Sequence, residues 1–179
     1  MILGLDVSTS ITGATILDYN EKVMYCEAWR LQNKNRFPDI FAKAEEIKNL
    51  LNSLKGEYDI QHIFIESPLW IIRGKSSAKT ILTLARFNGI VGWIVKDVFD
   101  IAPNFITASE ARSACGVPKR DKSVNIKQHI LNFLLDNEPT FSYDNTKHGN
   151  PVPGTYDRAD SLIIAKAGVR CQKEKKLIF

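Results

Sequence analysis

The hydrophobic positions of this chain change period several times, and each change marks a predicted element. Residues 1–7 (MILGLDV) form a nearly continuous apolar run that contains Asp6, and residues 11–20 and 23–31 form two further β-prone runs. Short polar connections between such runs are typical of antiparallel strands that follow one another in a sheet. We therefore predict three consecutive antiparallel strands at the N-terminus.

Beyond residue 35 the pattern alternates between helix and strand. Apolar residues recur every three or four positions over residues 35–55, which predicts an amphipathic helix that ends at Gly56. The run at 60–66 predicts a fourth strand. The further elements that we predict are helices at 78–99, 108–114, 123–135 and 156–170, and a short strand at 104–107. Gly89 and Gly92, inside the helix at 78–99, indicate close packing against another backbone.

This order of elements predicts an α/β fold for the whole chain. Three antiparallel strands followed by two parallel strands indicate a mixed five-stranded sheet with helices on both faces. Right-handed crossovers place the first and fourth strands side by side, and ligands collect at such strand ends. The chain of 179 residues fits a single domain, 1–179, in which the proline-rich and glycine-rich segment 136–155 is a long loop.

The composition is that of a soluble protein, with 44% hydrophobic and 25% charged residues. No apolar stretch approaches the roughly 18 residues that span a bilayer, and the N-terminus lacks a basic signal region. We therefore expect a cytoplasmic protein without a membrane partner. Cys26, Cys115 and Cys171 are odd in number and widely spaced, which indicates reduced structural thiols rather than a zinc site.

The charge is unevenly distributed along the chain. Residues 1–66 hold seven basic and ten acidic residues, whereas residues 67–179 hold seventeen and ten. Such an excess in the later part indicates either a polyanionic partner or simply a solvated face. The basic residues gather at Arg73, Lys75 and Lys79, at Lys119, Arg120, Lys122 and Lys127, and at Arg170, Lys173, Lys175 and Lys176.

Four carboxylates stand where the predicted elements end. Asp6 and Glu66 terminate apolar strands, and an unpaired buried carboxylate is costly. Asp157 and Asp160 are three residues apart and share one face of a helix, although a solvated first turn would explain that pair alone. Together the four predict a repulsive cluster that hard divalent cations neutralise, either Mg²⁺ or Mn²⁺. Two such ions are the usual apparatus for phosphodiester hydrolysis.

These segments carry a family resemblance. GLDVSTSITG with Asp6, IFIESP with Glu66, and DRADSLIIA with Asp157 and Asp160 resemble the catalytic segments of the RuvC family of Holliday junction resolvases, in the ribonuclease H-like superfamily. The order and spacing match over nearly the whole chain and resemble a short, phage-like form. Bacterial members usually have Asp-Pro-Gly after the first strand, whereas this chain has Asp6, Val7 and Ser8.

The resemblance implies an activity and a set of roles. It implies a Mg²⁺-dependent homodimer that resolves four-way DNA junctions by paired symmetric cuts, with two ions at each site. The helix containing LARFNG resembles the helix that pairs the family's subunits. Lys122 matches the basic residue near the cleaved phosphate, and Trp70 is the candidate wedge that opens the junction, although a core position is equally consistent. We expect the DNA backbone to be gripped by Arg73, Lys75, Lys79, Lys119 and Arg120.

Other readings of the sequence stay open or fail. A less selective nuclease on flaps, forks or RNA–DNA hybrids, or a non-catalytic junction binder, would share these features. A sugar-kinase or actin-like ATPase needs a second domain, so we expect no nucleotide cofactor. Gly74, Lys75 and Ser76 lack the upstream glycine of a Walker A loop. His148, in the long loop, is a candidate proton relay or phosphate contact.

Overall fold

The predicted mixed sheet forms the centre of the molecule. The computed structural model describes residues 1–68 and 77–176, with side chains as far as residue 174. The sheet has the strand order β3-β2-β1-β4-β5, in which the first three strands are antiparallel and β4 and β5 run parallel to β1. The strands are β1 (Ile2–Asp6), β2 (Ile11–Leu17), β3 (Val23–Arg30), β4 (His62–Glu66) and β5 (Asn104–Ile106). The predicted fold class is confirmed.

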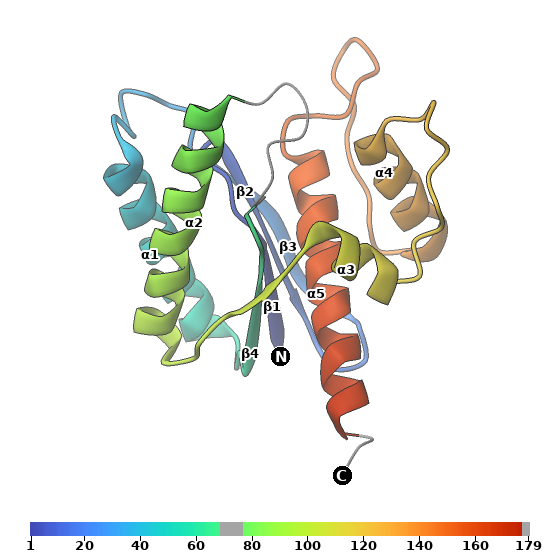
Figure 1. The fold of residues 1–179 in the computed structure, drawn as a ribbon, viewed down its shortest axis with the longest axis horizontal. Helices are drawn as coiled ribbons and strands as arrows, with labels where there is room; N and C mark the ends of the chain where they lie inside the picture. The colour runs from blue at the N-terminus through green and yellow to red at the C-terminus, as the bar shows by residue number, and fades with distance from the viewer. Residues whose placement is uncertain (69–76, 177–179) are drawn as a thin grey trace.

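Helices cover both faces of this sheet, as predicted (Figure 1). One face carries α1 (Ile40–Glu57) and α2 (Ala78–Phe99), and the other carries α3 (Ala108–Ala114), α4 (Ile126–Asn137) and α5 (Thr155–Lys176). Alternate side chains of β1 enter the two hydrophobic cores, with Leu3 in the first and Ile2 in the second. No helix in the described part of the chain is long and apolar enough to cross a membrane.

Helix boundaries follow the capping residues rather than the hydrophobic period. Helix α1 begins at Ile40 instead of residue 35, because the Asp39 side chain accepts hydrogen bonds from the amides of Phe41 and Ala42. It also passes through Gly56 and ends at Glu57. Asn125 caps α4 in the same way, so that helix begins three residues later than predicted and extends to Asn137. Helices α2 and α3 have the predicted bounds, and α5 runs further than predicted, to Lys176.

Neither Gly89 nor Gly92 packs against another backbone among the described residues, as was predicted for them. A Cβ on Gly92 would lie 3.1 Å from the Phe105 ring, which is a close side-chain contact, and one on Gly89 would meet none of the described residues within 4 Å. The close backbone contact lies instead between α5 and the sheet. A Cβ on Gly4 would lie 2.5 Å from the amide nitrogen of Ala165, and one on Gly13 would strike the carbonyl of Asp157. Helix α5 therefore lies directly on the backbones of β1 and β2.

Polar contacts hold α5 in this position. A buried hydrogen bond of 2.8 Å joins the hydroxyls of Thr15 on β2 and Ser161 on α5. Further along the helix, Lys166 pairs with Glu138 at 2.7 Å and with Glu21 at 3.2 Å. These ion pairs tie α5 to the turn between β2 and β3 and to the end of α4. The middle of α5 is thereby fixed to the sheet edge and to the end of α4.

The close approach of α5 can be tested at Gly4. We expect Gly4→Ala to lower the free energy of unfolding by about 2–3 kcal/mol, because the added methyl group forces α5 away from β1. Gly56→Ala is the control, since a Cβ there meets open space within a helix and should stabilise by up to about 1 kcal/mol. Urea unfolding followed by circular dichroism measures both. Equal stability of Gly4→Ala and the wild type would contradict this packing.

Candidate active site

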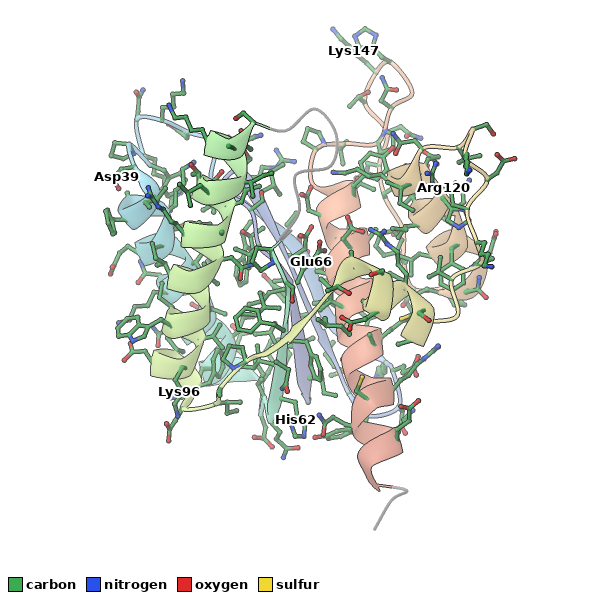
Figure 2. All side chains as sticks on the ribbon, in the orientation of Figure 1. Asp39, His62, Glu66, Lys96, Arg120 and Lys147 are labelled. Atoms are coloured by element: carbon green, nitrogen blue, oxygen red, sulfur yellow. The ribbon has the colours of Figure 1, made fainter. Side chains whose placement is uncertain are left out.

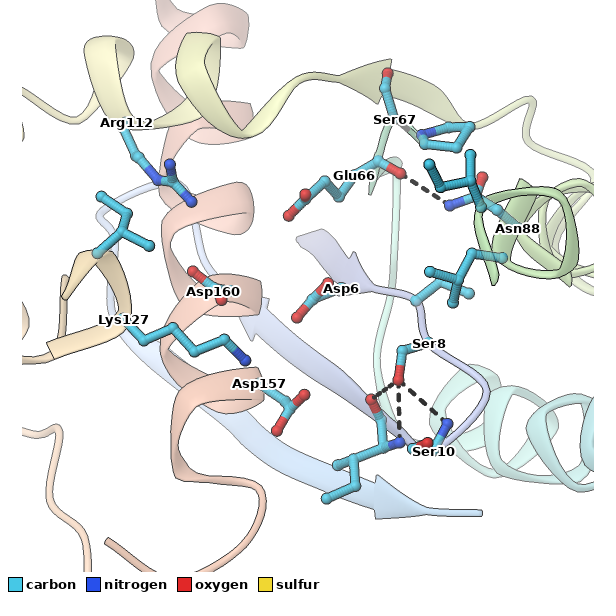
Figure 3. A pocket seen from close by; sticks show the side chains of 16 residues that line it. Asp6, Ser8, Ser10, Glu66, Ser67, Asn88, Arg112, Lys127, Asp157 and Asp160 are labelled. Carbon is cyan, nitrogen blue, oxygen red and sulfur yellow. Dashed lines mark hydrogen bonds between the residues drawn. The ribbon is translucent and has the colours of Figure 1, made fainter. Parts of the chain in front are cut away.

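All four predicted carboxylates line one pocket, where the ends of β1 and β4 face the beginning of α5 (Figure 3). The cavity has a volume of about 640 Å³. In the described part of the chain, the residues that contribute charged or polar side chains to its wall are Asp6, Ser8, Ser10, Glu66, Ser67, Asn88, Arg112, Lys127, Asp157 and Asp160. The structure thus brings together carboxylates that lie up to 154 positions apart in the sequence.

The sheet register places the two strand carboxylates. Asp6 is the last residue of β1 and pairs with Gly13 of β2, whose missing side chain makes room for Asp157. Glu66 ends the neighbouring parallel strand β4, and its backbone carbonyl accepts a hydrogen bond of 2.9 Å from the buried amide of Asn88 on α2. Because both strands end at the same edge of the sheet, the two carboxylates face the same pocket.

Burial and mutual repulsion raise the pKa of these carboxyl groups. The pKa of Asp6 lies well above its usual range, first through burial and then through the charges of Glu66, Asp160 and Asp157. Burial and the neighbouring Asp160 raise the pKa of Glu66 to about 7. Burial also raises the pKa of Asp157 and that of Asp160. The fold therefore holds together charges that are unstable as a group.

Two cations that the prediction of site residues omitted lie in the same pocket. Lys127 comes from the first turn of α4 and Arg112 from the last turn of α3. Figure 3 shows the Lys127 side chain extending toward Asp157 and Asp160, and the Arg112 side chain facing Glu66 and Asp160. Lys122, the lysine selected from the resemblance, is exposed in the segment before α4 and is not part of the pocket wall. The cap at Asn125 is the sequence signal that would have identified Lys127.

The turn after Asp6 has its own hydrogen-bond network. The hydroxyl of Ser8 donates to the carbonyl of Ile11 at 2.7 Å and accepts from the amides of Ser10 and Ile11. Lys43 of α1 donates to the carbonyl of Thr9 at 2.5 Å. Side-chain hydrogen bonds therefore close the turn in which the bacterial pattern has proline and glycine.

The donor set suits a hard divalent cation. Four carboxylates without a nearby histidine or thiolate are the all-oxygen ligands that Mg²⁺ and Mn²⁺ prefer. Within residues 1–68 and 77–174, however, no three acidic, histidine or cysteine side chains are grouped closely enough to hold an ion as they stand. The chemistry of the residues fits a metal, and its binding requires the carboxylates to draw together.

The other predicted residues that the structure describes do not line the pocket. Lys79 is exposed in the first turn of α2, and Lys119 and Arg120 are exposed between α3 and α4 (Figure 2 labels Arg120). Trp70, Arg73 and Lys75 lie outside the described residues.

His148 and the three cysteines do not line the pocket. His148 is exposed next to Lys147, which Figure 2 shows far from Glu66, and it does not line the pocket. Cys26, Cys115 and Cys171 are free thiols, as predicted. Burial raises the pKa of Cys115 to about 11, which makes that thiol unreactive.

Known structures share this fold. No family model and no curated protein sequence matches the chain. Among solved structures, RuvC of T. thermophilus in complex with a Holliday junction substrate matches with a TM-score of 0.66 at 10% identity, over 97% of this chain and 94% of that one. A further structure of Thermus thermophilus RuvC gives a TM-score of 0.64 at 10% identity over 97% and 96% of the two chains.

A second resolvase also matches. The yeast mitochondrial Holliday junction resolvase Ydc2 gives a TM-score of 0.63 at 16% identity, over 98% of this chain and 80% of that chain. At these identities the comparisons establish the fold. The RuvC-like fold predicted from the sequence motifs is therefore confirmed over nearly the whole chain.

The strained carboxylates predict a specific pH dependence of stability. A carboxyl group whose pKa is higher in the folded state stabilises at low pH, and this contribution is lost as the pH rises through the folded-state pKa. For Glu66 the loss falls between the ordinary value of 4.5 and about 7. In EDTA at pH 8, Glu66→Gln should therefore unfold at a higher temperature than the wild type, with a gain of about 2 kcal/mol.

The comparison of two pH values provides the control for this prediction. At pH 4 both proteins carry a neutral side chain at position 66, so their melting temperatures should converge. Differential scanning calorimetry in EDTA measures the melting temperatures of the two proteins at each pH. A Glu66→Gln protein that is less stable than the wild type at pH 8 would show that the carboxylate is not strained.

Proposed function

We propose that this chain is a Mg²⁺-dependent, structure-selective endonuclease that cleaves four-way DNA junctions. The observation that carries the proposal is a pocket with four carboxylates, from β1, β4 and α5, in a fold that two Holliday junction resolvases share. Gathering four like charges in one partly buried pocket lowers stability and serves no packing purpose. A role in binding cations for phosphodiester chemistry explains why the pocket contains them.

The four carboxylates would hold the metal. Asp6, Glu66, Asp157 and Asp160 supply oxygen ligands from three elements, with Mn²⁺ as a substitute for Mg²⁺. When bound, two such ions supply an activated water and stabilise the leaving oxygen of the phosphodiester. The chain's own part is to hold the backbones that carry these ligands in place, since α5 lies directly on the sheet backbone, while the side chains draw together around the ion. We assign the cuts as paired and symmetric, one from each subunit of a dimer.

The cations of the pocket would offset the charge of the phosphate. Lys127 and Arg112 face the carboxylates from the side of α4 and α3, where they can contact phosphate oxygens. We assign to Lys127 the role near the scissile phosphate that the sequence resemblance gave to Lys122. Lys122 itself is exposed and suits a contact to the DNA backbone.

Basic residues beside the pocket suit the same partner. Lys79 lies two residues before Ile81, which lines the pocket, and Lys119 and Arg120 precede α4, which supplies Lys127. Exposed cations on both sides of an acidic pocket fit the phosphates on either side of a cleavage point. We keep Trp70, Arg73 and Lys75, which follow Glu66 in the sequence, as proposed DNA contacts.

An exposed stripe on α2 supports a homodimer. Leu82 and Trp93 are 52% and 65% exposed, and Arg86 and Gly89 lie between them at helical spacing. Gly89 weakens the helix, and no contact with the described residues would require a glycine there, so close approach of a second helix is a reason for it. We propose that α2 pairs with its copy across this stripe, which gives each dimer two pockets for two strands.

Cleavage of an immobile four-way junction tests the catalytic proposal. With Mg²⁺ we expect the wild type to nick the junction and to leave a linear duplex of the same sequence intact, and EDTA should abolish cleavage. Asp157→Asn should reduce the rate at least about a thousandfold while it leaves junction binding unchanged or tighter, because it removes a ligand and one negative charge. Asp136→Asn, an exposed carboxylate on α4, is the control and should cut normally.

The other outcomes of the junction-cleavage experiment would lead to different conclusions. Cutting of both substrates would keep the nuclease and overturn junction selectivity. Tight junction binding without cleavage would support a non-catalytic binder, and wild-type activity of Asp157→Asn would overturn the assignment of the carboxylates.

The dimer is tested at Trp93. We expect Trp93→Glu to raise the dimer dissociation constant at least about a hundredfold, because it places a charge at the centre of an apolar contact. Phe41→Glu on α1 is the control, since Phe41 is also strongly exposed, at 70%, on a different helix. Analytical ultracentrifugation measures both. A monomeric wild type, or equal effects of the two variants, would contradict pairing through α2.

A further inference from the structure

Lys127 occupies a position that helix formation does not favour. It is the second residue of α4, where its amide donates to the Asn125 cap at 2.8 Å, and the first turn of that helix holds no acidic residue. The helix dipole disfavours a positive side chain at this end. The location of the lysine therefore requires a compensating interaction elsewhere.

The surroundings of Lys127 direct it into the pocket. Its ammonium lies 5.8 Å from the centre of the Tyr156 ring, one residue before Asp157. The Tyr156 hydroxyl donates to the side-chain oxygen of Gln128 at 3.1 Å, which joins the first turns of α4 and α5. Figure 3 shows the resulting direction, with the Lys127 side chain reaching toward Asp157 and Asp160.

Lys127 shares one pocket with all four carboxylates. Its side chain lines the same cavity as Asp6, Glu66, Asp157 and Asp160 and reaches toward the last two (Figure 3). Arg112 enters the same pocket beside Glu66 and Asp160. Among the described residues, no ion pair within 4 Å joins Lys127 to any carboxylate. The lysine thus acts on the whole cluster without being committed to one partner.

We infer that Lys127 is a tethered counter-cation, which stabilises the carboxylate cluster when no metal is bound and competes with the metal for it. The inference rests on the proposed metal site. Lys127 is otherwise exposed to solvent, so its long side chain can leave the cluster without breaking a specific ion pair. A metal held by the four carboxylates would supply the positive charge in place of Lys127, whose ammonium would then be free to contact a phosphate oxygen. One residue serves the metal-free site and the substrate complex in turn.

Competition makes an unusual prediction, because removing a pocket residue should improve metal binding. We expect Lys127→Met to bind Mn²⁺ between about threefold and tenfold more tightly than the wild type, while it cleaves junctions more slowly. Lys127→Arg keeps the charge and should keep the wild-type affinity. Lys122→Met removes an exposed lysine from the segment before α4 and should change the affinity much less. Isothermal titration calorimetry with Mn²⁺ in the absence of DNA measures all four proteins.

A second measurement needs no metal. In EDTA at pH 8, Lys127→Met should lower the melting temperature more in the wild-type background than in the Glu66→Gln background. The Glu66→Gln protein has one negative charge fewer in the pocket, so Lys127 has less repulsion to offset there. The double-mutant cycle cancels the effect of the helix dipole, which is the same in both backgrounds.

The outcomes separate this inference from the proposed function. If Mn²⁺ binds the wild type but not Asp157→Asn, the metal site stands, and unchanged or weaker binding by Lys127→Met overturns the counter-cation. If Mn²⁺ binds the wild type and Asp157→Asn equally, or neither of them, the metal site fails and the competition with it. If the changes in melting temperature caused by the two substitutions add up in the double variant, the role of Lys127 in the metal-free site is also overturned.

Discussion

The contact of α5 with the backbones of β1 and β2 is the constraint on which the site depends. Gly4 and Gly13 remove the side chains that would stand between the helix and the sheet. The helix can then bring Asp157 beside Gly13 and its strand partner Asp6. Ordinary side chains at the two glycines would hold the helix further from the sheet. Without this approach the carboxylates of α5 and those of the strands would belong to separate surfaces.

The same contact concentrates negative charge at a cost in stability. Burial and repulsion raise the pKa of the pocket carboxyl groups, so the fold must supply the stability that this site removes. Much of it comes from the two hydrophobic cores, and the ion pairs of Lys166 with Glu21 and Glu138 secure α5 further along the helix. The stabilising charges and those of the candidate site thus occupy different parts of one helix.

Sequence patterns predicted the elements and the carboxylates because both follow from local rules. Asp6 and Glu66 end apolar runs, and parallel strands bring such ends to one edge of the sheet. The cations were harder to predict, because a basic residue in a loop or first turn has no periodic signal. Lys122 and Lys127 are five residues apart, and the cap at Asn125 decides between them: it starts α4 at Ile126 and leaves Lys122 in the preceding segment. The packing glycines also escaped prediction: a glycine inside a strand, such as Gly4 or Gly13, indicates a close backbone approach but not which distant element makes it.

The turn after Asp6 shows which parts of a motif physics requires. Proline and glycine are one way to reverse the chain after a strand, because they fix or free the backbone. Here Ser8 achieves a reversal with three hydrogen bonds to the backbone of Ser10 and Ile11, and Lys43 holds Thr9 from α1. The requirement is that the turn leave Asp6 facing the pocket, and several sequences meet it. The carboxylates have no comparable substitute, since the proposed metal binding depends on their oxygen atoms. A chain can therefore diverge at the turn and still keep the residues on which the proposed chemistry depends.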